Sequence, residues 1–471
     1  LPLKGNKTVV IGSGPIRIGQ GIEFDYCSVH AAWALRDENT QSIMVNSNQE
    51  TVSTDFDTSD RLYFEPLDQE ALLDVIENEE INNVIPPTIV QFGGQTALDL
   101  SQDIHDVGYP ILGSSAESID IASDRGRFEE FLSRLDIPQP PGASVTSRKE
   151  ALMVAENITY PVVVRPSYVL GGKAMELIYS PDELDKYLSR DAMFTSERSI
   201  LVDHYMEGKE CEVDAICDGD SVLIPGIMEH IERAGVHSGD SISIYPGINL
   251  TEREVTTIVD YTTSIGLALG VKGLMNVQFV IVGGPPYRSP NRLREEISET
   301  TVYVLEVNLR SSRTVPFLSK VTGIPMVNLA TRVVLGKKLK ELGYGVGLWP
   351  KRKLVAVKAP VFSMSKLIGV DWYLGPEMKS TGEVMGIDYE FNSALMKALM
   401  ASNMTLVPNA VVLVSVADRD KDDAGKLVGK LLEAGCSIYA TEGTASMIRD
   451  MGEKVTLITK KLGQGYPNVV D

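Results

Sequence analysis

Several residue types that mark common protein classes are scarce in this chain of 471 residues. Its four cysteines, at positions 27, 211, 217 and 436, show neither metal-ligand pairing nor a disulfide framework. Its five histidines never occur in the HExxH or HxH spacings of zinc sites, which argues against a zinc enzyme. The cysteine usage predicts a reducing, cytoplasmic environment.

Positive charge is also in short supply, because 44 Lys and Arg residues face 64 Asp and Glu residues, for a net charge of −20. A chain this acidic is a poor general binder of nucleic acids or anionic membranes, so we expect neither as a partner. Long apolar runs are missing too, since none reaches the roughly 18 residues that cross a bilayer. The first residues do not resemble a signal peptide, because their short apolar stretch enters a Gly-rich turn.

Apolar residues nevertheless make up 43% of the chain, enough to build large buried cores. Strand-like runs at 7–12, 42–46 and 83–93 alternate with helix-like stretches, which predicts a parallel α/β sheet. Mixed helices and strands follow, and a fresh α/β unit begins at 409–418. That unit is short for a domain and the chain lacks an initiator methionine, which favours a fragment or one piece of a split polypeptide.

A Gly-rich segment, GSGPIRIGQG at 12–21, follows the first predicted strand. Glycines there allow a tight turn and bring backbone N–H groups towards an anion. The third glycine of a dinucleotide fingerprint arrives late, however, and Asn46 and Asn48 stand where an acidic residue is expected. A turn that packs domains together is therefore favoured over a nicotinamide-dependent oxidoreductase.

A stronger phosphate signal lies at 160–174, with the sequence YPVVVRPSYVLGGKA. Arg165 ends an apolar strand, and Gly171 and Gly172 belong to the loop that follows. A cation at a strand end can hold one phosphate of a nucleotide, while a Gly loop closes over the others. A structural arginine beside a β-turn is the alternative.

Two later strands add metal-ligand chemistry. Gln278 lies in MNVQF, and Glu306, Asn308 and Arg310 alternate in VLEVNLR, which places these three on one strand face. Carboxylate and amide oxygens beside a guanidinium form a hard-oxygen metal site next to a phosphate clamp. A solvated polar face fits the preceding apolar VYVL less well. These segments predict Mg–ATP binding, and Glu210 is a candidate for the ribose hydroxyls.

The segments YPVVVRPSYVLGGKA and VLEVNLRS resemble the two signature segments of carbamoyl-phosphate synthetase large chains. The resemblance extends through GIEFDYCSVHAAWAL, QFGGQTALDL, GIMEHIERAGVHSGDS and GPEMKSTGEVMG over nearly the whole chain, and it is to the C-terminal half of that family. It implies an α/β chain with a pre-ATP-grasp domain at 1–122, an ATP-grasp region at 123–400 and the incomplete start of a methylglyoxal-synthase-like regulatory domain at 405–471. The implied activity is the ATP-dependent phosphorylation of carbamate to carbamoyl phosphate, for arginine or pyrimidine biosynthesis or both.

The resemblance also implies a set of site residues. The residues matched to ATP contacts are Arg125, Arg165, Gly171, Gly172, His204, Glu210, His237 and Ser238. Gln278, Glu306 and Asn308 match the ligands of two Mg²⁺ or Mn²⁺ ions, and K⁺ is an open further candidate. Arg310 and Arg313, beside Asn308, match the catalytic groups that hold the transferred phosphoryl group and carbamate.

Partners follow from the same resemblance, namely the N-terminal synthetase half and a glutaminase small subunit. Glu23, Glu50 and Glu383 match motifs near the route by which carbamate arrives. A nucleotide effector is implied for the last segment, where the matching residues are Ser415, Lys421, Thr441 and Thr444, with Lys460 or Lys461 as a further candidate.

Some positions depart from the family pattern. Gln49 and Leu309 stand where proline is usual, 86–88 reads as an insertion, and the polar stretch 283–301 is longer than the usual turn. Two other hypotheses therefore stay open beside the synthetase half. One is a different ATP-grasp ligase, and the other is a nucleotide-binding assembly or regulatory piece without catalysis.

Overall fold

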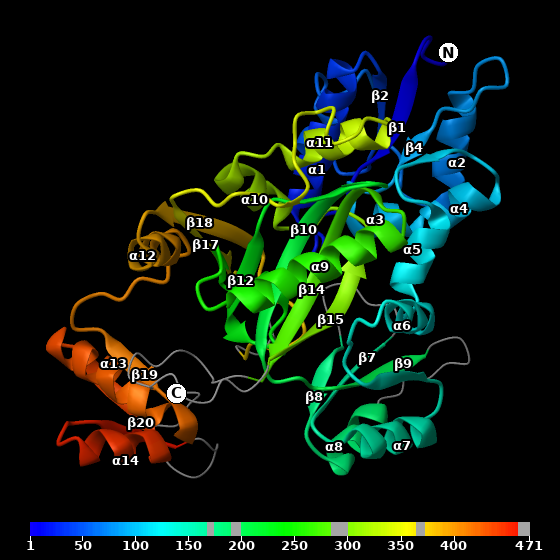
Figure 1. Ribbon diagram of the computed structural model, residues 1–471. Coiled ribbons are helices and arrows are strands. Elements are labelled where there is room, and N and C mark those ends of the chain that lie inside the picture. Colours follow the sequence, from blue (N-terminus) through cyan, green and yellow to red (C-terminus); the bar gives the residue numbers. More distant parts are fainter. Residues whose placement is uncertain (167–173, 190–198, 284–299, 364–372, 460–471) are drawn as a thin grey trace. The chain divides into compact units, whose positions relative to one another are not determined.

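The structure is a computed structural model, and it describes residues 1–166, 174–189, 199–283, 300–363 and 373–459. The chain forms two compact units, Leu1–Ser402 and Asn403–Asp471. Both units are drawn in Figure 1. Among the described residues, no helix combines the length and hydropathy needed to cross a bilayer.

The chain begins with a five-stranded, entirely parallel sheet in the order β3-β2-β1-β4-β5. Its strands are β1 (Lys7–Ile11), β2 (Gln41–Val45), β3 (Arg61–Tyr63), β4 (Thr88–Ile89) and β5 (Ile111–Leu112). The helices between them are α1 (Ile22–Asp37), α2 (Gln69–Asn78), α3 (Gly94–Asp99) and α4 (Ser101–Asp106). The predicted parallel sheet is confirmed, but the strand expected within 83–93 is only Thr88–Ile89, and β3 and β5 were not predicted.

Two helices lead from this sheet to a small antiparallel one. These are α5 (Ala116–Ser123) and α6 (Arg125–Arg134), and the Asp124 side chain caps α6 by accepting from the Arg127 N–H. The four-stranded sheet, in the order β6-β9-β7-β8, contains β6 (Gly142–Val145), β7 (Val162–Pro166), β8 (Glu176–Ile178) and β9 (Ile200–His204). Helices α7 (Arg148–Ile158) and α8 (Pro181–Leu188) cover one of its faces (Figure 1).

The largest sheet has nine strands among the described residues, and its main path is β15-β14-β10-β12-β13-β17-β18. These strands are β10 (Lys209–Asp218), β12 (Ile227–Arg233), β13 (Ser243–Tyr245), β14 (Lys272–Val282), β15 (Thr301–Asn308), β17 (Val355–Val361) and β18 (Gly382–Asp388), with β11 (Val222–Ile224) and β16 (Gly347–Leu348) beside β10. Figure 1 shows α9 (Glu252–Ala268) lying across β10, β14 and β15. The remaining helices of this unit are α10 (Val315–Thr322), α11 (Met326–Val334) and α12 (Phe391–Ala401).

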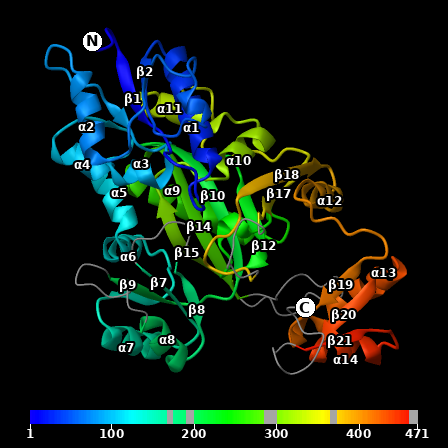
Figure 2. The same cartoon turned by 180° about the vertical axis from the view of Figure 1, so that it is seen from behind.

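One apolar core joins the first sheet to the largest one. Val9 and Ile11 of β1 belong to the same buried cluster as Val277 and Phe279 of β14. A second cluster joins α1 to α10 and α11, which lie beside it in the view from behind (Figure 2). Because close-packed interiors have low compressibility, this shared core fixes the loops of the first sheet relative to β14 and β15.

The second unit has a three-stranded parallel sheet in the order β19-β20-β21. Its elements are β19 (Val411–Val414), η4 (Asp418–Asp420), α13 (Lys421–Glu433), β20 (Ser437–Thr441), α14 (Glu442–Asp450) and β21 (Thr456–Ile458). This arrangement matches the strand–helix alternation expected after 409. Residues 284–299, which form most of the predicted long loop, lie outside the described residues.

A buried carboxylate ties the start of the chain to the first sheet. Glu79 accepts hydrogen bonds from the Leu3 N–H (2.8 Å), Lys7 Nζ (3.0 Å) and the Tyr63 hydroxyl (2.7 Å), and it also pairs with Arg61. Burial by itself would raise the pKa of the Glu79 carboxyl, but these hydrogen bonds outweigh burial and hold its pKa below the usual range. The ionised carboxylate is therefore part of the folded structure at neutral pH.

We predict that Glu79→Gln lowers the free energy of unfolding by about 3–5 kcal/mol, because it leaves the buried Lys7 ammonium without its counter-charge. The measurement is urea unfolding followed by circular dichroism. Glu70→Gln, at an exposed position of α2, the helix that ends just before Glu79, is the control and should cost less than about 1 kcal/mol. Equal losses in the two variants would contradict the assigned role of Glu79.

Candidate active site

A cavity of about 560 Å³ opens between the three sheets of the first unit. Thirteen site residues were predicted from the sequence, and eleven of them line this cavity. They are Arg125, Arg165, His204, Glu210, His237, Ser238, Gln278, Glu306, Asn308, Arg310 and Arg313. The other two, Gly171 and Gly172, lie outside the described residues. The structure thus brings together side chains that are up to 188 positions apart in the sequence (313 − 125).

A row of polar side chains runs along the last residues of β15 and into the turn after it. Asn308 Nδ2 donates to Glu306 Oε1 (3.1 Å), and Arg310 Nη2 donates to Asn308 Oδ1 (3.3 Å). Gln278 of β14 lies opposite Glu306 in the strand register. The three alternating side chains therefore share one side, as the sequence pattern predicts, although Arg310 lies two residues beyond the last residue of the strand.

The donor set around Glu306 suits a divalent ion that is shared with a nucleotide. Among the described residues, no three His, Cys, Asp or Glu side chains gather closely enough to hold a metal alone. One carboxylate and two amide oxygens, from Glu306, Asn308 and Gln278, are the hard ligands that Mg²⁺ or Mn²⁺ accepts. Mg²⁺ commonly completes its coordination with phosphate oxygens and water, so these residues fit a metal–nucleotide complex better than an all-protein cage.

Arg125 and His204 occupy another wall of the cavity, beside the small sheet. Arg125 Nη2 donates to Asp203 Oδ1 (2.8 Å) and to the Pro140 carbonyl (3.1 Å), while His204 Nδ1 lies 3.1 Å from the Thr159 carbonyl. Arg165 lines the same wall from β7. Arg125 is paired with the Asp203 carboxylate, so the two arginines together leave one net positive charge at this end of an acidic protein, which suits a phosphate group.

A buried histidine lies between two carboxylates of β10. His230 Nδ1 is 3.4 Å from Glu210 Oε2, and its Nε2 is 3.6 Å from Glu212 Oε1. Burial alone would lower the pKa of His230, but the two carboxylates outweigh it and raise the pKa to about 9. The imidazolium therefore holds Glu210, which also accepts from the Gly235 N–H (3.3 Å), in a fixed position on the cavity wall.

The short helix η2 (Ser238–Asp240) connects the nucleotide-site candidates to a neighbouring segment. His237 Nδ1 accepts from the Gly239 N–H (3.0 Å), and burial lowers the pKa of His237, so its ring stays neutral. Gln278 Nε2 donates to Ser238 Oγ (3.4 Å). The buried Asp240 carboxylate accepts from the backbone N–H groups of Lys379 and Ser380, both at 2.8 Å.

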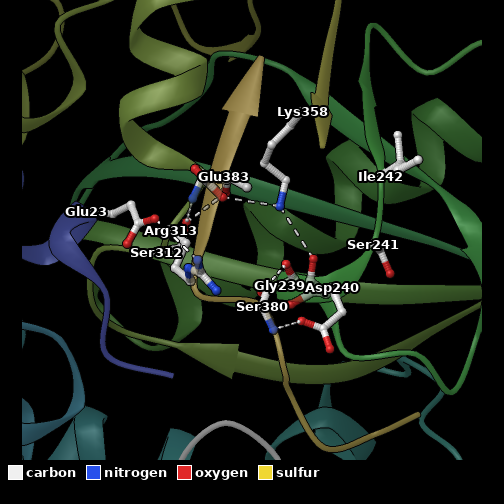
Figure 3. Close-up of polar contacts among 12 residues, drawn as sticks. Glu23, Gly239, Asp240, Ser241, Ile242, Ser312, Arg313, Lys358, Ser380 and Glu383 are labelled. Atoms are coloured by element: carbon white, nitrogen blue, oxygen red, sulfur yellow. Dashed lines mark hydrogen bonds and ion pairs between the residues drawn. The ribbon is translucent and has the colours of Figure 1, made fainter. Parts of the chain in front are cut away.

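Figure 3 shows a group of buried charges next to this helix. Arg313 Nη2 lies 3.3 Å from Glu23 Oε1, and Lys358 Nζ lies 3.6 Å from Glu383 Oε2. Lys358 also donates to the Ser238 carbonyl (3.4 Å). Two of the residues assigned to a carbamate route, Glu23 and Glu383, thus pair with cations that line the cavity, whereas Glu50 is exposed on the loop after β2.

Another buried carboxylate supports the turn that carries Arg313. Asp214 accepts from Asn276 Nδ2 (3.1 Å), Ser312 Oγ (2.8 Å) and the Thr314 hydroxyl. Burial raises the pKa of Asp214 to about 6. The turn is therefore held in place by the Asp214 side chain, which does not itself line the cavity.

Sequence reasoning missed several cavity residues, including Arg17, Gln95, Glu212 and Lys358. Two of them carried a signal that could have been used. Lys358 is a lone cation inside the apolar strand β17, and a lysine buried in this way needs a partner. Glu212 lies two residues after Glu210 in the same strand, so the two carboxylates are expected on the same face of the sheet. Arg17 and Gln95 gave no such signal, because their partners Thr96 and Arg310 are distant in the sequence.

In the second unit, the residues matched to an effector pocket lie close together. Ser415 Oγ and Thr441 Oγ1 are 2.8 Å apart, and Thr444 Oγ1 accepts from the Val416 N–H (3.1 Å). Lys421 begins α13 and pairs with Asp418 (2.7 Å). Lys460 and Lys461 lie outside the described residues.

We predict that His230 makes the stability of the protein depend on pH. Folding raises the pKa of His230 from 6.5 to about 9. The contribution of His230 to the free energy of unfolding is therefore complete below pH 6.5 and is lost as the pH rises through about 9. The free energy of unfolding is expected to fall by an amount on the order of 3 kcal/mol over this pH range. Urea unfolding between pH 6 and pH 10 measures it, and the curve of His230→Gln should be flatter. Parallel curves for the two proteins would exclude this role.

Comparison of the chain with known proteins identifies a family. Residues 4–121 match the carbamoyl phosphate synthase preATP-grasp domain, and residues 124–342 match the carbamoyl-phosphate synthase L chain ATP binding domain. The carbamoyl phosphate synthase large chain of Thermomicrobium roseum is 56% identical over 472 residues, covering 100% of this chain and 42% of that protein. That of Thermoanaerobacter sp. (strain X514) is 51% identical over 469 residues, covering 98% and 42%. The chain thus spans less than half the length of these relatives.

Solved structures show the same fold at low sequence identity. N5-carboxyaminoimidazole ribonucleotide synthetase from Thermotoga maritima has a TM-score of 0.57 at 14% identity, covering 85% of this chain and 98% of that one. Biotin carboxylase from Campylobacter jejuni has a TM-score of 0.56 at 16% identity, covering 76% of each chain. Both family models and both of these large chains point to one family, and the chain belongs to the carbamoyl phosphate synthase large-chain family.

Proposed function

We propose that this chain is the C-terminal, carbamate-phosphorylating half of a carbamoyl phosphate synthase large chain. The observation that carries the proposal is the row Glu306–Asn308–Arg310 in the same cavity as Arg125, Arg165 and Glu210. That arrangement supplies metal ligands, phosphate-binding cations and a ribose acceptor without a nucleophile–base pair. Phosphoryl transfer needs this combination, because positioning and charge stabilisation dominate its catalysis.

The reaction follows from the placement of the charges. Arg125 and Arg165 bind the nucleotide phosphates, and Glu210 accepts the ribose hydroxyls. Gln278, Glu306 and Asn308 would hold Mg²⁺ or Mn²⁺, which neutralises phosphate charge when bound. A carbamate oxygen attacks the γ-phosphorus of ATP in line, the new O–P bond forms as the bond to the β-phosphate oxygen breaks, and ADP leaves. Arg310 and Arg313 stabilise the transferred phosphoryl group and orient carbamate.

The proposal includes partners, because the chain covers only 42% of its relatives' length. The N-terminal half would supply carbamate from bicarbonate and ammonia, and a glutaminase would supply the ammonia. The paired charges Arg313–Glu23 and Lys358–Glu383 support the assignment of this side of the cavity to carbamate entry. We further propose that a nucleotide effector binds at Ser415, Thr441 and Thr444. We also propose that the protein is cytoplasmic and acts in arginine or pyrimidine biosynthesis, or in both. The case for K⁺ rests on the family resemblance alone.

We predict that the purified chain makes ATP from carbamoyl phosphate and Mg–ADP. This assay runs the half-reaction backwards, so it needs neither carbamate delivery nor the other half. Glu306→Gln should reduce ATP formation by at least about 100-fold, because it removes the one carboxylate among the three predicted metal ligands. Luciferase detection of ATP is the measurement, and chelation of the metal with EDTA should abolish the signal.

The control for this assay is Glu156→Gln, at an exposed position on α7, which should retain wild-type rates. Binding of ADP without any ATP formation by the wild-type chain would refute the synthetase half. That outcome would favour a non-catalytic nucleotide-binding piece. ATP formation from a different acyl phosphate, but not from carbamoyl phosphate, would indicate another ATP-grasp ligase.

A further inference from the structure

Two turns from different sheets are joined by hydrogen bonds at the edge of the cavity. The first turn, residues 90–95, follows β4 of the parallel sheet, and the second, residues 309–311, follows β15. The Ser311 N–H donates to the Gln91 carbonyl (2.8 Å), and Ser311 Oγ donates to the Phe92 carbonyl (3.0 Å). Arg310 Nε donates to Gln95 Oε1 (3.0 Å). The parallel sheet therefore sets the position of the residue at the end of the polar row.

The turn after β4 is itself held rigidly. A Cβ atom at Gly93 would lie 2.2 Å from the Gly12 carbonyl oxygen, so the backbone of this turn packs directly on the turn after β1. Gly94 has a φ of +76°, a conformation that favours glycine, and it begins α3. Gln95 follows at once, so its direction depends on this packing and not on a flexible loop.

The Gln95 side chain is oriented at both ends of its amide. Its Nε2 donates to Asp99 Oδ1 (2.8 Å), one turn along α3, which leaves Oε1 to accept from Arg310. The Arg310 guanidinium also lies 5.7 Å from the centre of the Phe24 ring, a second contact with the parallel-sheet part of the chain. Neither neighbour adds a negative charge next to the guanidinium.

The remaining donors of Arg310 are suited to an anion. A guanidinium has five N–H groups. Among the described residues, Nε bonds to Gln95, Nη1 to the Ser311 carbonyl (2.9 Å) and Nη2 to Asn308 Oδ1 (3.3 Å). Two N–H groups remain, one on each terminal nitrogen, and Arg310 lines the cavity. A neutral amide on Nε fixes the plane of the group without cancelling its charge.

We propose that Gln95 is a positioning residue that orients Arg310 towards the phosphoryl group transferred to carbamate. The inference rests on the proposed function and deepens it, since it makes the parallel sheet responsible for recognising the phosphorylated product. Gln95 acts on the phosphoryl end of the cavity. It makes no contact with the nucleotide-binding candidates Arg125, His204 and Glu210 among the hydrogen bonds of the described residues.

The test compares two ligands in three variants. Gln95→Met keeps the side-chain length but removes the acceptor, and Gln95→Glu keeps an acceptor but adds a negative charge. Gln102→Met is the matched control, because Gln102 makes the same amide-to-carboxylate contact with Asp106 (2.6 Å) on exposed α4. Isothermal titration with Mg–ADP, and then with inorganic phosphate on the Mg–ADP complex, gives the two affinities.

We expect Gln95→Met to weaken phosphate binding by about tenfold or more with Mg–ADP affinity unchanged, since a charge-assisted contact that orients the donor is lost. Gln95→Glu should weaken phosphate binding further, because its carboxylate pairs with Arg310. In the reverse reaction both variants should raise the KM for carbamoyl phosphate and leave that for ADP unaltered. The control should match the wild-type chain in every measurement.

Three results would overturn the inference. They are wild-type phosphate affinity in Gln95→Met, an equal loss of Mg–ADP and phosphate binding with a lowered melting temperature, and no phosphate binding by the wild-type complex. The second result would assign Gln95 a merely structural role. The binding measurements need no turnover, so they decide the inference even if carbamoyl phosphate proves not to be a substrate.

Discussion

Ionised side chains buried in the cavity wall impose the constraint on which the site depends. A charge taken out of water costs several kcal/mol unless an opposite charge or hydrogen bonds compensate it. His230 meets this condition between Glu210 and Glu212, Arg313 meets it with Glu23, and Lys358 meets it with Glu383. Each pairing fixes the direction of a side chain at the cavity, so under the proposed function the contacts that stabilise the fold would also orient the groups that bind the nucleotide and the phosphoryl group.

The shared apolar core makes this arrangement possible. Because β1 and β14 contribute to one buried cluster, the turn after β4 and the turn after β15 are held side by side. The 12–21 turn takes part in this packing. Its backbone at Gly12 packs against Gly93, which agrees with the interpretation of that segment as a packing turn. The pre-ATP-grasp part is thus a wall of the site as well as a scaffold.

The fold is shared with enzymes of different specificity. A biotin carboxylase and an N5-carboxyaminoimidazole ribonucleotide synthetase superpose on this chain at 14–16% identity, so the fold alone does not identify the substrate. The identity of 56% to a carbamoyl phosphate synthase large chain, together with Arg310, Arg313 and their partners, is what supports carbamate as the acceptor.

Local patterns in the sequence were sufficient for the parallel sheet, for the row at 306, 308 and 310, and for the Arg165 strand. Alternation along a strand and short apolar runs are properties of neighbouring residues, and neighbours are visible in a sequence. They were not sufficient for the boundary between α5 and α6, which lies at Asp124, the residue whose side chain caps α6. Such details depend on a single competing hydrogen bond.

Only the tertiary structure decided which distant residues meet. Gln95 and Arg310 are 215 positions apart, and no periodicity relates them. The Lys358–Glu383 and Arg313–Glu23 pairs also join different elements. Glu79 and Lys7 form a buried ion pair only because folding of the first sheet brings them together. Burial of these charges is a property of the packed core, so these ion pairs and their roles arise only when the sheets come together.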